Sequence, residues 1–187
     1  MARFRPHWFH YVAASIATLL ATVVGVLFYG LLYLHWFTNL TYSMPVGLYR
    51  LRPVDHLARG TIVQVCQSPR AAKMSINREY MDHGDCWDGS DALLKEVVGL
   101  PGDRVTVGAS GVCVNGRRLP WSEPRGLDSR MRPLKPLSGT FVIGKAQVWL
   151  YSPHPRSFDS RYYGPVDRSL IRGIGVPVWV AAMRRDV

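Results

Sequence analysis

Charged residues are missing from almost the whole first quarter of the sequence. Arg3 and Arg5 are the only charged side chains before Arg50, and the 44 positions between Arg5 and Arg50 contain no Asp, Glu, Lys or Arg. Within this gap, residues 11–33 are nearly all apolar and would span roughly 34 Å as a helix at about 1.5 Å per residue. Because a hydrocarbon core is about 30 Å thick, the gap predicts one transmembrane anchor over residues 11–36.

Aromatic side chains mark both ends of this apolar run, where amphipathic rings favour the membrane interface. They are Trp8, Tyr11, Tyr33 and Trp36. A cleaved signal peptide usually has only about 7–15 apolar residues before a small-x-small site, whereas this run is longer and ends in large residues. A buried core helix is also a poor match for an apolar run of this length.

The two early arginines predict how the anchor is oriented. Arg3 and Arg5 flank one end of the apolar run with no acidic residue nearby. Because positive charge is retained in the cytoplasm, we expect residues 1–10 inside and residues 38–187 outside a single-pass anchor. In a bacterial inner membrane, the outside is the periplasm. The lipid bilayer is therefore an expected partner.

Acidic residues are also scarce. Asp and Glu number 13 against 23 Lys and Arg, which gives a formal net charge of +10. Such a charge raises nucleic acid as a partner, but the basic residues are scattered and form no basic helix or aromatic-interleaved patch. Anionic lipid headgroups explain the charge at least as well, and a solvated basic face explains most of it. Nucleic acid is therefore not an expected partner.

Cysteines are few and form no metal-binding pattern. Cys66, Cys86 and Cys113 include no CxxC, and no HExxH occurs, so neither a metal nor a cofactor is expected. In an oxidising compartment two cysteines can pair. Cys66 and Cys86 bracket a segment with the texture of an insertion and are the favoured pair. The sequence leaves the connectivity open, and three buried free thiols are the alternative.

The chain after the anchor has a β-rich texture, with frequent Gly and Pro between apolar runs, and Asn115-Gly116 is a strong hairpin signal. Residues 68–83 contain helix formers after a Ser-Pro start and predict a helical insertion, whereas residues 121–137 predict an irregular loop. The fold class is mainly β, with one compact domain behind one helix. The expected strands lie in 60–65, 93–100, 103–119, 139–144, 147–152 and 174–183.

Ser43 is a candidate nucleophile in the loop just beyond the anchor, although a lone loop serine is most often a solvated hydroxyl. A serine needs a base to take its proton, and none of the six histidines has a telling neighbourhood. A lysine can serve if burial lowers its pKa from about 10.4. Lys95, among leucines and valines, is a better candidate than Lys145, which follows a glycine. An outward-facing lysine on an edge strand is the alternative for Lys95.

A third polar cluster lies at residues 157–161, with the sequence Ser-Phe-Asp-Ser-Arg. It contains two hydroxyls, a carboxylate and a guanidinium. Asp159 and Arg161 are two residues apart and would face the same side of a strand, where they could brace a site. The alternative is a polar turn without a role in chemistry.

Taken in order, the three segments resemble the type I signal peptidase family, from the anchor to the end of the chain. Within this family, the chain looks most like the TraF branch, whose members mature pilin subunits of conjugative transfer systems. The likeness lies in the sequence of the first segment, in the cysteines at 66 and 86 and in the Tyr-Tyr-Gly-Pro-Val that follows Arg161. The matching segments are Ser43-Met44-Pro45, Lys95-Glu96-Val97-Val98-Gly99-Leu100-Pro101-Gly102-Asp103 and Ser157-Phe158-Asp159-Ser160-Arg161-Tyr162.

The resemblance implies a Ser–Lys dyad in a signal-peptidase-like β-rich domain, with Ser43 as nucleophile and Lys95 as general base. The backbone N–H of Ser43 would stabilise the oxyanion. The resemblance gives supporting roles to four further residues. Thr41 is a second oxyanion donor, Ser157 orients the lysine amine, and Asp159 and Arg161 brace the site, with the acid implicated in activity in the TraF branch.

The expected function is a membrane-anchored serine endopeptidase that cleaves signal sequences or terminal segments from membrane-tethered secreted or pilin precursors. In the TraF branch, such cleavage can be coupled to cyclisation of the pilin. The chain has one anchor and Ser-Pro-His-Pro-Arg before Ser157, where housekeeping signal peptidases have two anchors and a Gly-Asp-Asn-Arg-Asp lead-in. Both departures favour a dedicated substrate. The alternative is a non-catalytic anchored scaffold, in which Ser43 and Lys95 would lie beyond roughly 4 Å.

Overall fold

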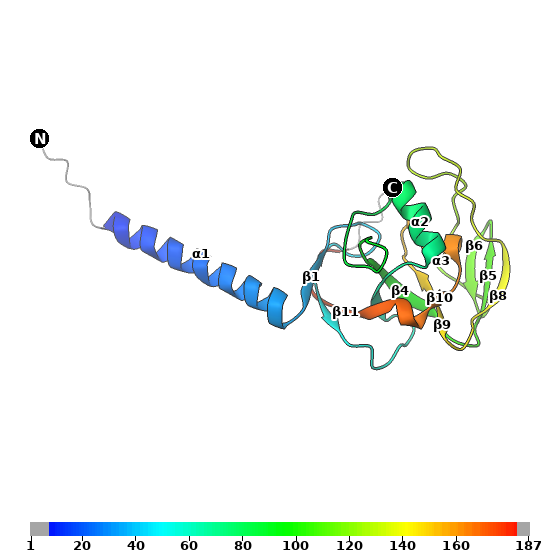
Figure 1. The fold of residues 1–187 in the computed structure, drawn as a ribbon, viewed down its shortest axis with the longest axis horizontal. Helices are drawn as coiled ribbons and strands as arrows, with labels where there is room; N and C mark the ends of the chain where they lie inside the picture. The colour runs from blue at the N-terminus through cyan, green and yellow to red at the C-terminus, as the bar shows by residue number, and fades with distance from the viewer. Residues whose placement is uncertain (1–7, 183–187) are drawn as a thin grey trace, which may run out of the picture.

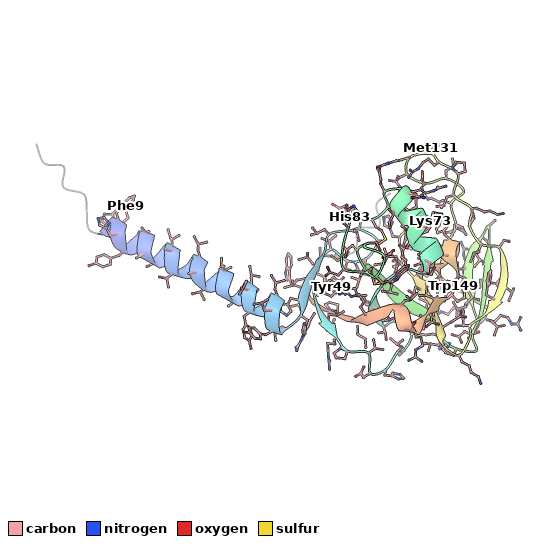
Figure 2. All side chains as sticks on the ribbon, in the orientation of Figure 1. Phe9, Tyr49, Lys73, His83, Met131 and Trp149 are labelled. Carbon is pink, nitrogen blue, oxygen red and sulfur yellow. A yellow bond between two sulfur atoms is a disulfide. The ribbon has the colours of Figure 1, made fainter. Side chains whose placement is uncertain are left out.

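The structure, a computed structural model, describes residues 8–182. A single helix, α1 (Trp8–Tyr33), projects away from a β-rich domain (Figure 1). Phe9 lies at the end of α1 that is farthest from this domain (Figure 2). The helix is long and apolar enough to cross a membrane, and it has almost no side chain covered by the rest of the chain. Arg3 and Arg5, which carry the orientation argument, lie outside the described residues.

The helix is offset from the predicted anchor of residues 11–36. It begins three residues earlier, at Trp8, and ends at Tyr33, because the backbone is already paired as strand β1 (Trp36–Asn39) from Trp36 onward. Gly30 is the one buried residue of α1 within the described chain. A Cβ at Gly30 would lie 2.2 Å from the Trp36 ring, so the absence of a side chain lets this ring pack on the helix backbone.

A seven-stranded antiparallel sheet forms the centre of the domain, in the order β1-β2-β11-β3-β4-β9-β10. Strand β11, near the end of the chain, lies between β2 and β3 and so joins the two ends of the domain. Strand β4 lies between β3 and β9, in the interior of the sheet. The remaining bounds are β2 Gly47–Arg52, β3 Ile62–Val65, β4 Leu93–Gly99, β9 Gln147–Tyr151, β10 Val166–Asp167 and β11 Ile171–Val180.

A second, four-stranded sheet has the order β7-β6-β5-β8. Its strands are β5 (Arg104–Gly108), β6 (Gly111–Val114), β7 (Arg117–Arg118) and β8 (Gly139–Val142). The predicted hairpin at Asn115-Gly116 is confirmed between β6 and β7. Both residues have positive φ, at 49° and 81°, as a two-residue turn of this kind requires. The mainly β prediction is therefore confirmed.

The two sheets pack together through a core of valines around Trp149, which has no exposed surface. Figure 2 shows Trp149 inside the β-rich domain. A Cβ at Gly99 would lie 2.7 Å from the Cβ of Trp149, so a glycine at this position lets β4 and β9 approach closely. The other buried members of this core are Val98, Val105, Val107, Val112, Val114, Ile143 and Tyr151.

Two segments lie outside both sheets. Helix α2 (Pro69–Asn77) lies within the predicted insertion and begins with a proline in its first turn. The helix stops short of residue 83 because Arg78 leaves helical geometry and Glu79 has a φ of +54°. The predicted irregular loop of residues 121–137 has one isolated bridge, between Leu127 and Pro133, and no strand.

Candidate active site

Ser43 lies in the loop that joins β1 to β2. These strands pair in register up to Asn39 and Gly47, so residues 40–46 make the turn between them. The next residue along, Met44, is 2% exposed and packs with Tyr49 and Leu94. Burial of Met44 therefore fixes one side of the loop against β4, whereas Ser43 remains partly accessible.

Asn39 holds the loop from the inside and is a residue that the sequence reasoning missed. Its side-chain amide nitrogen donates to the carbonyl oxygens of Thr41, Met44 and Pro45, at 3.0, 3.1 and 3.0 Å. The Tyr49 hydroxyl donates to the Pro45 carbonyl as well, at 2.7 Å. Asn39 is 7% exposed. An unpaired carbonyl in such a place is costly, so these bonds fix the loop conformation.

Lys95 is buried in the interior of the sheet. It lies on β4, pairs with Val63 of β3 and is 2% exposed. The alternative of an outward-facing lysine on an edge strand is therefore wrong, because β9 covers the other side of β4. The Lys95 Nζ lies 3.3 Å from the Ser43 Oγ, within hydrogen-bond distance.

Burial lowers the pKa of Lys95 to about 8. Two charged neighbours act in opposite directions on this pKa, because Asp159 raises it and Arg161 lowers it, both by less than burial does. Removal of the ammonium from water disfavours its charged form. About a tenth of the amine is therefore neutral at pH 7, and a neutral amine can accept a proton from Ser43.

Asp159 and Arg161 form a fully buried ion pair. The Arg161 Nε and Nη2 atoms donate to the two carboxylate oxygens of Asp159 at 2.8 and 2.7 Å. Arg161 Nη2 also donates to the carbonyl oxygens of His154 and Ser157, at 3.0 and 3.2 Å. Its guanidinium lies 5.4 Å from the centre of the Tyr151 ring. The pair therefore ties the segment before α3 (Ser160–Tyr163) to β9.

The expectation that this pair shares one face of a strand is wrong. Asp159 is the N-cap of α3, where its side chain accepts from the Arg161 N–H at 3.1 Å, and Arg161 lies in the helix. An aspartate followed by Ser-Arg-Tyr is a good cap sequence, because a carboxylate can accept the unpaired N–H groups of a first turn. The ion pair forms across this cap.

Ser157 and Thr41 line a cavity of about 480 Å³. Ser43 and Lys95 line the same cavity. The Ser157 side chain is buried, and its hydroxyl has no hydrogen-bond partner among the described residues, so a bond to Lys95 is not formed. The Thr41 hydroxyl donates to the Asn39 Oδ1 at 2.8 Å and lies 3.4 Å from the Ser43 Oγ. While this bond holds, the Thr41 proton is directed to Asn39.

The segment from Lys95 to Asp103 also contains a turn, and the residues of this turn stabilise the fold. Asp103 accepts from the Leu100 N–H at 2.7 Å, from Asn115 at 2.7 Å and from the guanidinium of Arg59. Gly102 has a φ of +87°, which glycine adopts without strain. This turn closes the connection from β4 to the second sheet.

The model of the family described as signal peptidase, peptidase S26, matches residues 8–180 of this chain. This chain belongs to the peptidase S26 signal peptidase family. The matched range includes α1, the Ser43 loop, Lys95 and the Asp159–Arg161 pair. The resemblance drawn from the three sequence segments is confirmed, and the family and α1 together indicate a membrane-anchored protein of the peptidase type.

Relatives of this S26 chain include transfer proteins called TraF. The "Probable conjugal transfer protein TraF" of Sinorhizobium fredii is 39% identical over 75% of this chain and 74% of its own length. The plasmid transfer protein TraF of Escherichia coli is 37% identical, and the conjugal transfer protein TraF of Agrobacterium tumefaciens is 36% identical, each over 75% of this chain and 80% of the relative. These matches support a peptidase-like role in conjugation.

Among solved structures, signal peptidase I of Enterococcus faecalis aligns with 65% of this chain and 97% of its own. The two are 20% identical, with a TM-score of 0.38. The family assignment therefore rests on the sequence match.

A disulfide joins Cys66 and Cys86 across the insertion of this S26 chain, with their Cα atoms 5.6 Å apart. Both cysteines are 7% exposed. Cys113, on β6, is a half-buried free cysteine. Among the described residues, no group of three or more His, Cys, Asp or Glu side chains could hold a metal ion.

Proposed function

We propose that this chain is a membrane-anchored serine endopeptidase with a Ser–Lys dyad. The observation that carries the proposal is the 3.3 Å approach of the Lys95 Nζ to the Ser43 Oγ, with the lysine 2% exposed. The alternative of a scaffold with a decayed site expects these atoms beyond roughly 4 Å, so the short distance favours catalysis.

In the proposed mechanism, neutral Lys95 takes the proton of the Ser43 hydroxyl as its oxygen attacks the substrate carbonyl. The carbonyl oxygen becomes an oxyanion, which the Ser43 N–H stabilises. Within residues 8–182 this N–H donates no other hydrogen bond. Protonated Lys95 then gives its proton to the leaving amine as the peptide bond breaks, which leaves an acyl-serine.

The acyl-serine is released by water or by an amine of the substrate. Lys95 takes a proton from the attacking group as the new bond forms at the acyl carbon. The bond between the acyl carbon and the Ser43 Oγ then breaks, and protonated Lys95 returns its proton to Ser43. Attack by water gives a linear product, and attack by a terminal amine gives a cyclic one. The intact mass distinguishes them, because the linear product is heavier by one water molecule.

Two supporting roles are part of the proposal. Ser157 has an unpaired buried hydroxyl and lines the cavity that holds the dyad, so we assign it the role of orienting the Lys95 amine during the reaction. Thr41 can add an oxyanion donor only if its hydroxyl turns away from Asn39, with which it bonds at 2.8 Å. We therefore assign the Ser43 N–H as the main oxyanion donor.

The proposed substrates are secreted or pilin precursors tethered in the same membrane, and the TraF relatives support a place in conjugative transfer. We place the N-terminus in the cytoplasm and the β-rich domain in the periplasm, on the charge of Arg3 and Arg5. Ser43 follows the end of α1 by ten residues, which suits a cleavage site close to the bilayer surface.

The test is replacement of Ser43 or Lys95 by Ala in the full-length chain in membranes, with processing of a co-expressed precursor followed by immunoblot. Both variants should remain in the membrane and lose processing. Ser110→Ala and Lys145→Ala are matched controls, because both residues are exposed and neither lines the cavity. Normal processing by Ser43→Ala would sink the proposal.

A further inference from the structure

The cavity beside the dyad has a wall that belongs to neither sheet. One side is made by the dyad and by Ser157 and Phe158, whereas the other is made by two segments that pack on each other. The first is the disulfide-closed insertion, residues 66–86, and the second is the long loop, residues 121–137. Tyr80 of the insertion and Leu127, Asp128, Met131 and Leu134 of the long loop line the cavity.

Asp128 links these two segments. Its carboxylate accepts from the Tyr80 hydroxyl at 2.7 Å and from the Arg132 Nε at 2.7 Å. The backbone N–H groups of Arg130 and Arg132 add two bonds at 2.9 Å each. The side chain of Asp128 is only 4% exposed. A carboxylate with this many donors has little capacity left for a ligand, so its role is to hold the long loop in place.

Further contacts run across the same junction. The Arg132 Nη2 donates to the Arg78 carbonyl at 2.8 Å, and its guanidinium lies 5.6 Å from the centre of the Tyr80 ring. The ion pair of Arg130 and Glu79 is solvent-exposed on both sides and contributes little. The partly buried bonds from Tyr80 to Asp128 and from Arg132 to the Arg78 carbonyl are therefore the main connection between the insertion and the long loop.

Tyr80 also contacts the side of the cavity that contains the dyad. Its ring lies 5.4 Å from the ring of Phe158, and Phe158 stacks on Tyr162 at 5.6 Å. Phe158 also separates Ser157 from Asp159 in the chain. A single Tyr80 side chain thus bonds to the long loop with its hydroxyl and packs against the dyad side with its ring.

Most of the surface that this arrangement presents to the cavity is apolar, although Glu79, Arg125 and Arg156 also line it. Leu127 and Met131 are 44% and 74% exposed, although they lie on a loop without regular secondary structure. Leu93, Leu134 and Phe158 continue the apolar lining toward Lys95. A cavity of about 480 Å³ holds more than one small side chain, and large exposed apolar residues around a catalytic cavity favour contact with an apolar ligand.

We propose that Asp128 is a positioning residue for substrate selection. Together with Tyr80 it fixes the long loop as the second wall of the cavity, and this wall binds an extended apolar segment of the substrate polypeptide next to the scissile bond. The proposal rests on the proposed function, because the cavity receives a peptide only if Ser43 is the nucleophile. Among residues 8–182 the Asp128 side chain bonds only to the insertion and to its own loop and not to Ser43 or Lys95, so it acts on peptide binding and not on the dyad.

The experiment uses the full chain in detergent micelles with two quenched-fluorescence peptides, both with Ala on each side of the scissile bond. One has leucines at the flanking positions, and the other has serines. We expect Asp128→Asn to raise KM for the leucine peptide about tenfold, with kcat unchanged, and to leave KM for the serine peptide within about twofold. Labelling of Ser43 by a fluorophosphonate probe, and the pH midpoint of that labelling, should not change.

Two further variants keep the test decisive. Tyr80→Phe removes one bond to Asp128 while the ring remains, and should give a smaller rise in KM for the leucine peptide even if Asp128→Asn folds poorly. Arg130→Ala removes only the exposed ion pair and should match the wild type. Equal KM changes for the leucine and serine peptides would overturn the assignment of Asp128. So would an unchanged KM for the leucine peptide in both Asp128→Asn and Tyr80→Phe.

The same assays separate this inference from the proposed function. If Ser43→Ala cleaves the peptides as fast as the wild type, the proposed function fails and the inference fails with it. If Ser43→Ala is inactive and the wild type cleaves both peptides, but Asp128→Asn does not discriminate between them, only the inference fails.

Discussion

The Arg161 guanidinium holds the Asp159 carboxylate through hydrogen bonds of 2.8 and 2.7 Å, and neither side chain has any exposed surface. Both charges act on Lys95, where they oppose each other: the carboxylate raises the pKa of the amine and the guanidinium lowers it. The paired charges therefore leave burial as the main determinant of the Lys95 pKa.

Asp159→Asn should change both the stability and the pH dependence. Loss of the carboxylate leaves a buried guanidinium uncompensated, which costs about 3–5 kcal/mol in free energy of unfolding. It also removes the group that raises the Lys95 pKa, so the midpoint of the pH–rate profile should move to lower pH. Urea unfolding and initial rates of the detergent-solubilised chain measure the two effects. The exposed Asp85→Asn is the control, and a midpoint that moves upward would contradict the assignment.

The wild-type rate should rise with pH through about 8, because burial lowers the Lys95 pKa to about 8 and only the neutral amine accepts the Ser43 proton. Below the midpoint, the neutral fraction and the rate should increase about tenfold per pH unit. Values of kcat/KM for a peptide substrate across the neutral and alkaline range give the midpoint. A midpoint near the ordinary lysine value of 10.5 would show that Lys95 is not desolvated in solution.

Lys95→Met should stabilise the protein at neutral pH. The folded-state pKa of about 8 lies below the ordinary value of 10.5, so the unfolded chain binds more protons and wild-type stability rises with pH between these two values. The ammonium therefore costs on the order of 3 kcal/mol at neutral pH, and methionine removes this cost. Urea unfolding across this pH window should show a gain that shrinks as pH rises. Lys145→Met, on an exposed turn, should show no gain.

Asn39→Ala should slow catalysis without removing the dyad. Three carbonyl groups of the Ser43 loop lose their donor, so the loop should leave its productive conformation for part of the time. We expect kcat to fall about 10- to 100-fold with a smaller effect on KM. The rate at which a fluorophosphonate labels Ser43 should fall in parallel. Thr38→Ala, on the exposed face of the same strand, is the matched control, and equal rates for both variants would reject the role of Asn39.

Removal of the disulfide should loosen the insertion. The Cys66–Cys86 bond closes a sequence separation of 20 residues, for which a chain-entropy estimate gives about 3 kcal/mol. A Cys66→Ser/Cys86→Ser double variant should therefore unfold at lower urea concentration and be cut first by protease within residues 66–86. Cys113→Ser leaves the disulfide intact and should be cut no faster than the wild type. First cleavage outside residues 66–86 would mean that the insertion is held by its other contacts.

The sequence was enough to predict the mainly β class, the apolar helix and the approach of Ser43 to Lys95. The β class and the helix follow from strong local patterns. The approach of Ser43 to Lys95 follows from three segments that occur in the same order as in the family. The choice between a buried and an edge-strand Lys95 could not be made from periodicity. It depends on β9 lying next to β4, and the two pair between residues some 50 positions apart.

Other features could not be predicted because their partners are set by turns or by distant segments. Asn39 acts through carbonyl groups, which every residue has, so no side-chain pattern identifies its role. Asp128 meets Tyr80 across 48 residues of the sequence and has no local signal. The Asp159 cap did have a local signal, an aspartate before a short helical sequence. Periodicity could not distinguish it from a strand, because a helix of four residues is too short to show a period.

The Trp36 ring on the bare backbone of Gly30 has a consequence for the whole molecule. Only two residues separate α1 from β1, and the second of them is already bonded to Leu51 through its carbonyl oxygen at 2.9 Å. The connection between the anchor and the domain is therefore short and bonded to the sheet. A membrane-spanning helix answers a change of bilayer thickness by tilting, and here the domain would tilt with it. If the proposed substrates are tethered in the same membrane, bilayer thickness would then set the angle at which the cavity meets them.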